Sequence, residues 1–401
     1  MTVDSATRRM DLPSFIVFSD DWGQHPSSCQ HIFRHIAARH RVIWVNTVGM
    51  RSPKLTSRDI SKAWRKLRGM LRGAPAGEYR CSAPVGLTVC QPAMLPFSGI
   101  AGVRRLNRMS VLRSVRRLTL ALDIRNPIVV TTVPNACDYV SDLGAAAVVY
   151  YCVDDFTQWP GLDHSVVRQM EQDLLQNSDI LIATSRRLLD GFREQGRHAE
   201  LLSHGVDLAL FSAEPVREHP CLESIPRPRF GYFGLFDERT NQDLLSRLAA
   251  RMPHCSFVIT GPVATEQAAL GDHPNVFFTG SIEYADLPSL VKGLDALFIP
   301  YHVNDFTASI SPLKLNEYLL TGLPVVTTPM AEAVRRGGEI SIAATLDEWQ
   351  DALQSSIGLD SQERRRKMRI ALAGESWASK ADEFLRMCTE PRGAGNVRPA
   401  V

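Results

Sequence analysis

The feature that most restricts the fold of this chain is an alternation of short apolar runs with amphipathic stretches, which occurs in both halves of its 401 residues. Strands that are regularly followed by helices predict a parallel sheet with helices on both faces. In the first half we expect strands at 15–18, 42–45, 87–90, 128–131, 148–153 and 180–183. In the second half we expect them at 230–233, 257–260, 276–278, 296–300, 325–326 and 340–342. The predicted class is therefore α/β, with two doubly wound, Rossmann-like domains.

A linker rich in proline and charge separates the two halves. We place the first domain at residues 13–210 and the second at 226–375. A further helix is expected over 376–388. Residues 391–401 contain Gly, Pro and Arg without an apolar pattern, and we predict that they form a disordered tail.

Composition and charge exclude several classes of protein. A net charge of +2 gives no overall attraction to nucleic acid, so any basic surface must come from local clusters. The 8 cysteines are scattered without C-x-x-C spacing, which indicates free thiols in a reducing cytoplasm and no metal site. The N-terminus does not have the pattern of a signal peptide, and no apolar run of about 18 residues is present. We therefore expect a cytoplasmic protein that could still lie on a membrane.

One stretch in the second half has the pattern of a loop, a helix, a turn and a buried strand. Ser311 is the predicted N-cap, Pro312 the first helical residue and Gly322 the left-handed residue after the helix. Lys314 would lie in the first turn, where the helix dipole disfavours a cation. A lysine is favourable there if a phosphate binds at the helix N-terminus. The alternative is a surface ion pair between Lys314 and Glu317.

From Pro312 to Val326 the pattern P-x-K-x-x-E-Y-x-x-x-G-x-P-V-V resembles the donor-binding motif of GT-B glycosyltransferases. The nearest resemblance is to the large retaining family four (group 1), followed by inverting GT-B transferases of bacterial polysaccharides. His204-Gly205-Val206-Asp207 is similar to the segment that ends the first domain in family four, with His204 in place of asparagine. The resemblance covers the second domain well and the first only thinly. It implies an active site in a cleft between the domains, and a terminal helix that packs back on the first domain.

The resemblance also implies roles for individual residues. Lys314 would bind the nucleotide diphosphate and Glu317 the nucleotide ribose. Many members have a second glutamate eight positions earlier, near the transferred sugar, and here that position is Ser309. The resemblance therefore leaves open whether the anomeric configuration is retained or inverted.

Three turns after predicted strands would complete the donor site. Arg239, after the glycine turn at Gly234, suits bidentate contact with phosphate, and the alternative is an ion pair with Asp237 or Glu238. Gly261 would let the nucleotide approach closely, and the backbone near Ile282 would contact the base. The predicted donor-binding residues are Gly234, Arg239, Gly261, Ile282, Ser309, Ser311, Lys314 and Glu317. The resemblance implies a donor site that works without an essential metal, and no D-x-D motif lies in a convincing metal-binding setting, so we expect no metal. We also expect no cofactor, since the nucleotide diphosphate sugar is the donor substrate.

Two adjacent carboxylates, Asp154 and Asp155, follow a buried strand of the first domain. Either could accept the proton of an acceptor hydroxyl, and in the resemblance inverting enzymes commonly use an aspartate there. The alternative is that one of them caps the following segment. The loop after the first strand, with Trp22, Gly23 and His25, is predicted to lie on the acceptor side, because ligands bind at the carboxyl ends of such strands.

Two basic stretches of the first domain, residues 51–72 and 103–117, interleave arginine and lysine with apolar residues. Basic helices with an apolar edge suit an anionic membrane surface. Nucleic acid is the other electrostatic interpretation, but no nucleic-acid motif accompanies these stretches. A solvated helix face is the third interpretation.

The predicted function is a hexosyltransferase-type glycosyltransferase. It would move a sugar from a nucleotide diphosphate sugar to a lipid-linked glycan acceptor in polysaccharide or glycolipid biosynthesis. We expect it at the inner face of the cytoplasmic membrane. The alternatives are a nucleotide-sugar 2-epimerase of the same fold and a non-catalytic nucleotide-binding relative.

Overall fold

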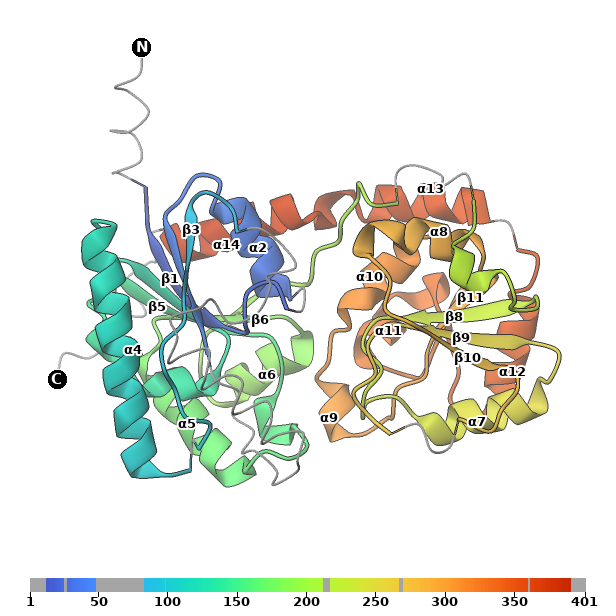
Figure 1. The fold of residues 1–401 in the computed structure, drawn as a ribbon, viewed down its shortest axis with the longest axis horizontal. Coiled ribbons are helices and arrows are strands. Elements are labelled where there is room, and N and C mark those ends of the chain that lie inside the picture. The colour runs from blue at the N-terminus through green and yellow to red at the C-terminus, as the bar shows by residue number, and fades with distance from the viewer. Residues whose placement is uncertain are drawn as a thin grey trace, which may run out of the picture. The chain divides into compact units, whose positions relative to one another are not determined.

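The computed structural model describes residues 12–24, 27–47, 83–97, 99–211, 217–266, 270–359 and 361–390. The chain divides into two compact units. Unit 1 comprises the described residues up to Ser203 together with those from Trp377 onward, and unit 2 comprises those from His204 to Ser376. The predicted architecture of two parallel α/β sheets is confirmed (Figure 1).

Unit 1 is built on a seven-stranded sheet in the order β3-β2-β1-β4-β5-β6-β7, and every pair in it is parallel. Its strands are β1 (Phe15–Ser19), β2 (Val42–Asn46), β3 (Leu87–Cys90), β4 (Ile128–Thr131), β5 (Ala147–Cys152), β6 (Ile180–Ala183) and β7 (Glu200–Leu201). Its helices are α2 (Ser28–Ile36), α4 (Ala101–Ala121), α5 (His164–Asn177), α6 (Arg186–Glu194) and α14 (Trp377–Thr389). Strands β1, β2 and β4 are buried throughout, as expected for parallel strands covered on both faces.

Unit 2 is built on a six-stranded parallel sheet in the order β10-β9-β8-β11-β12-β13. Its strands are β8 (Arg229–Phe233), β9 (Ser256–Thr260), β10 (Val276–Gly280), β11 (Ala296–Ile299), β12 (Val325–Thr327) and β13 (Ser341–Ile342). Its helices are α7 (Gln242–Arg251), α8 (Leu287–Lys292), α9 (Asp305–Ala308), α10 (Leu313–Leu320), α11 (Ala331–Arg335), α12 (Leu346–Ser355) and α13 (Ser361–Ala371).

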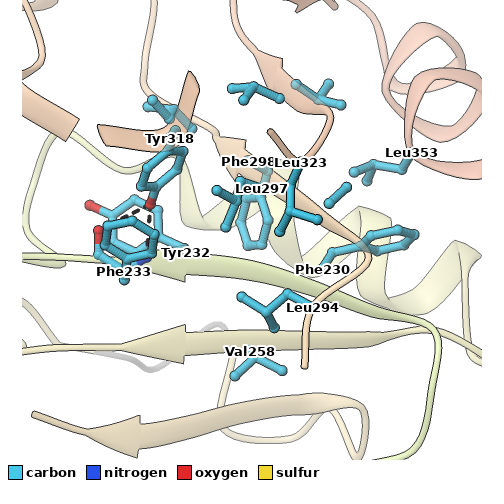
Figure 2. Packing of buried hydrophobic residues seen from close by; sticks show 14 of the residues in the cluster. Phe230, Tyr232, Phe233, Val258, Leu294, Leu297, Phe298, Tyr318, Leu323 and Leu353 are labelled. Atoms are coloured by element: carbon cyan, nitrogen blue, oxygen red, sulfur yellow. Dashed lines mark hydrogen bonds between the residues drawn. The ribbon is translucent and has the colours of Figure 1, made fainter. Parts of the chain in front are cut away.

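The core of unit 2 fixes helix α10 against the centre of its sheet. The centroid of the Phe257 ring on β9 lies 5.8 Å from that of Phe230 and 5.9 Å from that of Phe298. The Tyr318 hydroxyl on α10 accepts a hydrogen bond from Phe233 N at 2.7 Å and donates one to Phe233 O at 3.0 Å. Figure 2 shows this pair of bonds as dashed lines. Because Phe233 is the last residue of β8, these bonds hold α10 beside the end of that strand.

The terminal helix α14 packs within unit 1, on helix α2. The Phe384 ring lies 5.6 Å from the Phe33 ring on α2 and 5.6 Å from the Tyr151 ring on β5. The Trp377 ring stacks on His31 at 4.5 Å with an angle of 7° between the planes. Aromatic side chains bury large apolar areas, so these contacts tie the last helix to a unit whose other elements lie more than 170 residues earlier in the sequence.

Both sheets reverse their strand order once, between β1 and β4 in unit 1 and between β8 and β11 in unit 2. Ligands of doubly wound sheets bind outside the carboxyl ends of the strands at such a switch point. In unit 2 the segments that follow these two strands contain Gly234 and Tyr301. A ligand site is therefore expected where Gly234 and Tyr301 lie.

Gly86, next to β3, allows a close approach of two backbone segments in unit 1. A Cβ atom there would lie 2.1 Å from Ala37 O and 2.7 Å from His40 O. Gly86→Ala should force a backbone shift and lower the free energy of unfolding by about 1–3 kcal/mol. Gly102→Ala is the control, since a Cβ atom there has no heavy atom within 4 Å and alanine is the better helix former. Thermal unfolding checks the pair, and equal melting temperatures for Gly86→Ala and the parent would contradict the close approach.

Candidate functional site

The floor of the candidate site is formed by the turns after β8, β9 and β10. Gly234 N donates to Thr260 O at 2.9 Å, and Gly261 N donates to Gly280 O at 2.8 Å, so the three turns lie side by side. Gly234 has φ 119° and Gly261 has φ 134°, a conformation that only glycine adopts readily. A Cβ on Gly261 would also lie 2.3 Å from Gly234 O. Both glycines are therefore required by the close packing of the turns.

Helix α10 begins one residue later than predicted, and Ser311 is not its N-cap. Pro312, with φ −66° and ψ 119°, is the N-cap residue, and no side chain caps the helix. The reason is the extended conformation of Pro312, which keeps it outside the helix. The first backbone N–H groups of α10 therefore have no side-chain acceptor. Gly322 takes the predicted left-handed conformation, with φ 79°, directly after the C-cap.

Lys314, in the first turn of α10, is partly buried and points at the end of β8. Its Nζ donates to Tyr232 Oη at 2.6 Å and lies 3.8 Å from the centroid of the Tyr232 ring. A Cβ on Gly234 would lie 3.1 Å from this Nζ, so the ammonium group lies over the glycine turn. In the part of the chain that the structure describes, Lys314 forms no ion pair, and the alternative pair with Glu317 is not present. Burial lowers the pKa of Lys314, while Tyr301 opposes that shift.

Glu317 lies one turn further along α10 and is also partly buried. Its Oε1 accepts a hydrogen bond from Tyr284 Oη at 2.8 Å. Tyr284 begins a short 3-10 helix, Tyr284–Asp286, that follows β10. Burial raises the pKa of Glu317, and the Tyr284 bond only partly offsets this rise. The Glu317 carboxylate thus accepts a hydrogen bond from Tyr284, and burial disfavours its charged form.

Arg239 forms the contact with Asp237 that was its predicted alternative. Its Nε lies 2.9 and 3.0 Å from the two carboxylate oxygens, and its Nη2 lies 2.6 Å from Oδ2. Both side chains are largely buried, with 20% of Arg239 and 11% of Asp237 exposed. The guanidinium carbon also lies 5.6 Å from the centroid of the Tyr301 ring, whose centroid is 5.5 Å from Lys314 Nζ. Both cations therefore lie near the Tyr301 ring, and the Asp237 carboxylate forms an ion pair with Arg239.

The remaining predicted donor residues lie at element ends. Ser309 is the C-cap of α9 and is 2% exposed. Ile282 is partly buried and packs against the core of unit 2. The structure thus brings together Gly234, Gly261, Lys314 and Arg239, while Glu317 lies one helical turn away beside Tyr284.

In unit 1 the predicted base candidates have local hydrogen-bond partners. Asp155 Oδ1 accepts from Thr157 N at 3.0 Å and from Thr157 Oγ1 at 2.6 Å, which is the capping alternative. Asp154 Oδ1 accepts from Asp155 N at 2.9 Å. The geometry gives Asp155 a capping role and leaves the role of a base as a prediction.

The predicted acceptor-side loop is tightly packed at its start. Trp22 is 1% exposed and its ring lies 4.9 Å from the Trp44 ring, so this side chain belongs to the core. Gly23 N donates to Gln30 Oε1 at 3.0 Å. His25 lies outside the described residues.

Four functional candidates were missed by the sequence analysis. Tyr232, Tyr284 and Tyr301 contact the predicted charged residues, and their position at strand ends was the available signal. The fourth is Asp20, directly after β1, a partly buried carboxylate that accepts from Gln30 Nε2 at 2.6 Å and Ser27 Oγ at 3.1 Å. Burial raises the pKa of Asp20.

Helix α4 carries the second basic stretch, 103–117, and its arginines fall into two groups. Arg104 and Arg108 face unit 1 and pair with Asp138 and Asp142. The exposed face of the helix has a different composition, with four arginines and three apolar side chains. These residues are Arg105, Leu106 (55% exposed), Met109 (52%), Arg113, Arg116, Arg117 and Leu120 (83%), and Arg116 also donates to Asp142 O at 3.3 Å.

Two further properties of the described residues concern membrane-spanning helices and metal sites. No described helix has the length and apolar character needed to cross a bilayer. No group of three or more His, Cys, Asp or Glu side chains in the described ranges could hold a metal ion. The first basic stretch, residues 51–72, lies outside those ranges.

Comparison with known proteins gives a family match in unit 2 and a fold match over nearly the whole chain. Residues 227–357 match the family described as Glycosyl transferases group 1. The chain is 26% identical over 172 residues to TuaH of Bacillus subtilis (strain 168), named for a proposed role as a teichuronic acid biosynthesis glycosyltransferase. That match covers 41% of this chain and 43% of TuaH, so the chain spans less than half the length of this relative.

Two solved structures share the fold. Sucrose-phosphate synthase from Thermosynechococcus elongatus has a TM-score of 0.66 and 14% identity, over 94% of this chain and 98% of the synthase. HepE of Anabaena in complex with UDP-glucose has a TM-score of 0.64 and 12% identity, over 94% of this chain and 100% of HepE. At these identities the match shows a GT-B fold and nothing more about activity.

The different surroundings of two glutamates predict opposite effects on stability. Burial raises the pKa of Glu317 above 4.5, so its ionised form destabilises the fold as pH rises through that raised pKa. Glu348 accepts from Ala344 N at 2.6 Å and Thr345 N at 3.0 Å, which lowers its pKa, so its ionised form stabilises the fold above pH 4.5. At pH 7, Glu317→Gln should therefore raise the free energy of unfolding, and Glu348→Gln should lower it.

Denaturant unfolding at pH 7 and near pH 4 checks this pair. Both differences should shrink as pH falls and the carboxyl groups become protonated. A Glu317→Gln protein that is less stable than the parent at pH 7 would show that its carboxylate stabilises the fold.

Proposed function

We propose that this protein transfers a sugar from a nucleotide diphosphate sugar. The premises are the match of unit 2 to the glycosyl transferases group 1 and the GT-B fold of the chain. The acceptor would be a growing glycan of a cell-surface polysaccharide or glycolipid. The family match, the TuaH relative and the fold support this proposal.

The observation that carries the proposal is the ammonium group of Lys314. It lies in the first turn of an eight-residue helix that has no side-chain cap, and it forms no ion pair among the described residues. The helix dipole and the free N–H groups favour an anion at the same place. A partly buried cation without a carboxylate is costly unless a ligand supplies the negative charge. A diphosphate group fits this requirement, since it would contact both the ammonium group and the helix N-terminus.

In this proposal the site acts on the leaving group. As the bond between the sugar and the diphosphate breaks, negative charge grows on the departing phosphate oxygen. Lys314, the N-terminus of α10 and the Arg239 guanidinium would stabilise that charge. Glu317, with one oxygen bound by Tyr284, would accept hydrogen bonds from the ribose hydroxyls. Neither a metal nor a cofactor is part of the proposal.

The proposed donor and the proposed acceptor are each suggested by a different similar protein. UDP is the first nucleotide to test, because HepE was crystallised with UDP-glucose. A lipid-linked glycan is the proposed acceptor, since TuaH is named for teichuronic acid biosynthesis. Asp154 is the better candidate for the acceptor base, because Asp155 is already the cap of the segment that follows it.

We further propose that unit 1 contacts an anionic membrane through the exposed face of α4, together with residues 51–72. Arg105, Arg113 and Arg117 would lie at the lipid head groups. Leu106, Met109 and Leu120 would enter the apolar boundary below them. Such a placement would give the enzyme access to an acceptor whose lipid anchor stays in the bilayer.

Removal of the Lys314 charge tests the donor site. Lys314→Ala should weaken binding of UDP by about 1.5–3 kcal/mol, the value of a charge-assisted hydrogen bond, and leave the fold intact. Lys367→Ala, an exposed lysine on α13, is the control and should bind as the parent does. Isothermal titration calorimetry gives both affinities, and unchanged affinity in Lys314→Ala would remove the diphosphate role.

The same preparations separate the proposed transferase from its alternatives. With nucleotide sugars and a lipid extract, a transferase releases the nucleoside diphosphate only when the acceptor is present. Epimerised or hydrolysed donor without acceptor would indicate the epimerase, and binding without turnover would indicate a non-catalytic relative.

Exchange of the α4 charges tests the membrane contact. The triple variant Arg105→Gln, Arg113→Gln, Arg117→Gln should float less with anionic vesicles, by up to about 1 kcal/mol per charge. The control triple variant, Arg125→Gln, Arg168→Gln, Arg193→Gln, removes the same charge from exposed positions elsewhere in unit 1. Binding of the parent should fall with salt. Equal flotation of both triple variants would rule out the α4 face.

A further inference from the structure

We propose that Tyr232 and Tyr301 are positioning residues that hold Lys314 charged and aimed at the anion site. The ammonium group of Lys314 would then be stabilised by one phenol oxygen and two aromatic rings, in place of the carboxylate that commonly pairs with a buried lysine. This inference rests on the proposed function, because it requires that a negatively charged ligand binds to the Lys314 ammonium group. It adds two residues whose part in binding is indirect, through the ammonium group.

The hydroxyl of Tyr232 is held in one orientation by its two hydrogen bonds. It donates to Leu235 O at 2.6 Å, so only a lone pair faces Lys314, and Nζ donates to it at 2.6 Å. Tyr232 itself is 1% exposed and packs against the Phe236 ring, with centroids 5.8 Å apart. The acceptor for Lys314 is therefore fixed by the core before any ligand arrives.

Tyr301 interacts with both cations of the site. Its ring centroid is 5.5 Å from Lys314 Nζ and 5.6 Å from the Arg239 guanidinium carbon, and its side chain is 1% exposed. The negative face of an aromatic ring attracts a cation, and more strongly in a dry site. Tyr301 therefore offsets part of the repulsion between these two cations, of which Arg239 also has Asp237 as a counter-ion.

The Tyr232 hydroxyl is a neutral contact, because burial raises its pKa, and such a contact suits a binding site better than an ion pair would. A carboxylate beside Lys314 would cancel its charge, and an incoming phosphate would have to displace it. A phenol oxygen and ring faces stabilise the ammonium group and leave its full charge for the ligand. The cost is a lower pKa, because burial and Arg239 both lower the pKa of Lys314 while Tyr301 and Asp237 raise it.

The sign of the pH effect follows from these groups. Lys314 must be protonated to bind an anion. Lys314 and Arg239 lower the pKa of Tyr301, and the negative charge that its hydroxyl gains on ionisation is the largest influence that raises the Lys314 pKa, so loss of this hydroxyl removes that influence. The ammonium form should then be lost at a lower pH, and anion affinity with it. A purely structural loss would lower affinity at every pH without moving the midpoint.

The test measures binding of inorganic pyrophosphate and of UDP from pH 6 to 10 by calorimetry, on the full chain. Tyr301→Phe should move the alkaline midpoint of binding down by about half a pH unit or more. Tyr232→Phe, which keeps the ring and loses the acceptor, should weaken binding of both probes by about 10-fold. Ionisation of the probe is the same for every variant and cancels in the comparison.

Tyr150→Phe is the matched control, since its buried hydroxyl donates to Glu171 Oε1 at 2.8 Å in unit 1 and neither residue belongs to the candidate site. It should lose stability and keep both the affinity and the midpoint of the parent. If Tyr232→Phe and Tyr301→Phe also keep both, while Lys314→Ala loses binding, the positioning role is wrong and the proposed function stands. A parent protein that binds neither probe would overturn both.

Discussion

The parallel direction of the strands is the constraint on which the candidate site depends. Because all strand pairs of each sheet run the same way, every loop that follows a strand meets the others at one edge. In unit 2 this brings together Gly234, Gly261 and Tyr301, which are far apart in the sequence. The strand order reverses between β8 and β11, and Lys314 in the first turn of α10 contacts Tyr232 near the end of β8. The charged residues of the site are thus gathered by the topology of the sheet.

Charge balance explains the detailed arrangement at that edge. Two cations, Lys314 and Arg239, lie near the Tyr301 ring, and the Asp237 carboxylate forms an ion pair with the Arg239 guanidinium. The positive end of α10 adds to an unbalanced positive field. Tyr318 fixes α10 to the end of β8, and the ammonium group of Lys314 donates to Tyr232 beside it. In the proposed function, this excess of positive charge attracts the diphosphate.

Local signals in the sequence were sufficient for most of the secondary structure and for part of the site. Buried strands are apolar on both faces, so their positions can be recognised without any knowledge of their partners. Gly322 and Lys314 could also be interpreted from the local sequence. Gly322 suits the left-handed backbone conformation after a helix, and Lys314 lies where the helix dipole disfavours a cation. The N-cap was predicted one residue early, because Ser311 has the right side chain but Pro312 has the extended backbone. Such a shift lies within the usual uncertainty of helix ends.

The sequence by itself determined the class of fold, the order of the elements and the helix that carries Lys314 in its first turn, because these follow from periodicity, from glycine and proline, and from a lysine placed against the helix dipole. Only the tertiary structure decided which groups surround that charge. Tyr232 and Tyr301 look like ordinary strand residues, and they contact Lys314 only because β8 and β11 are neighbours across the switch point. The arginines of α4 are alike in sequence, and folding divides them into those paired with Asp138 and Asp142 and those left on the surface. Contacts between residues distant in sequence depend on packing, and no local pattern contains that information.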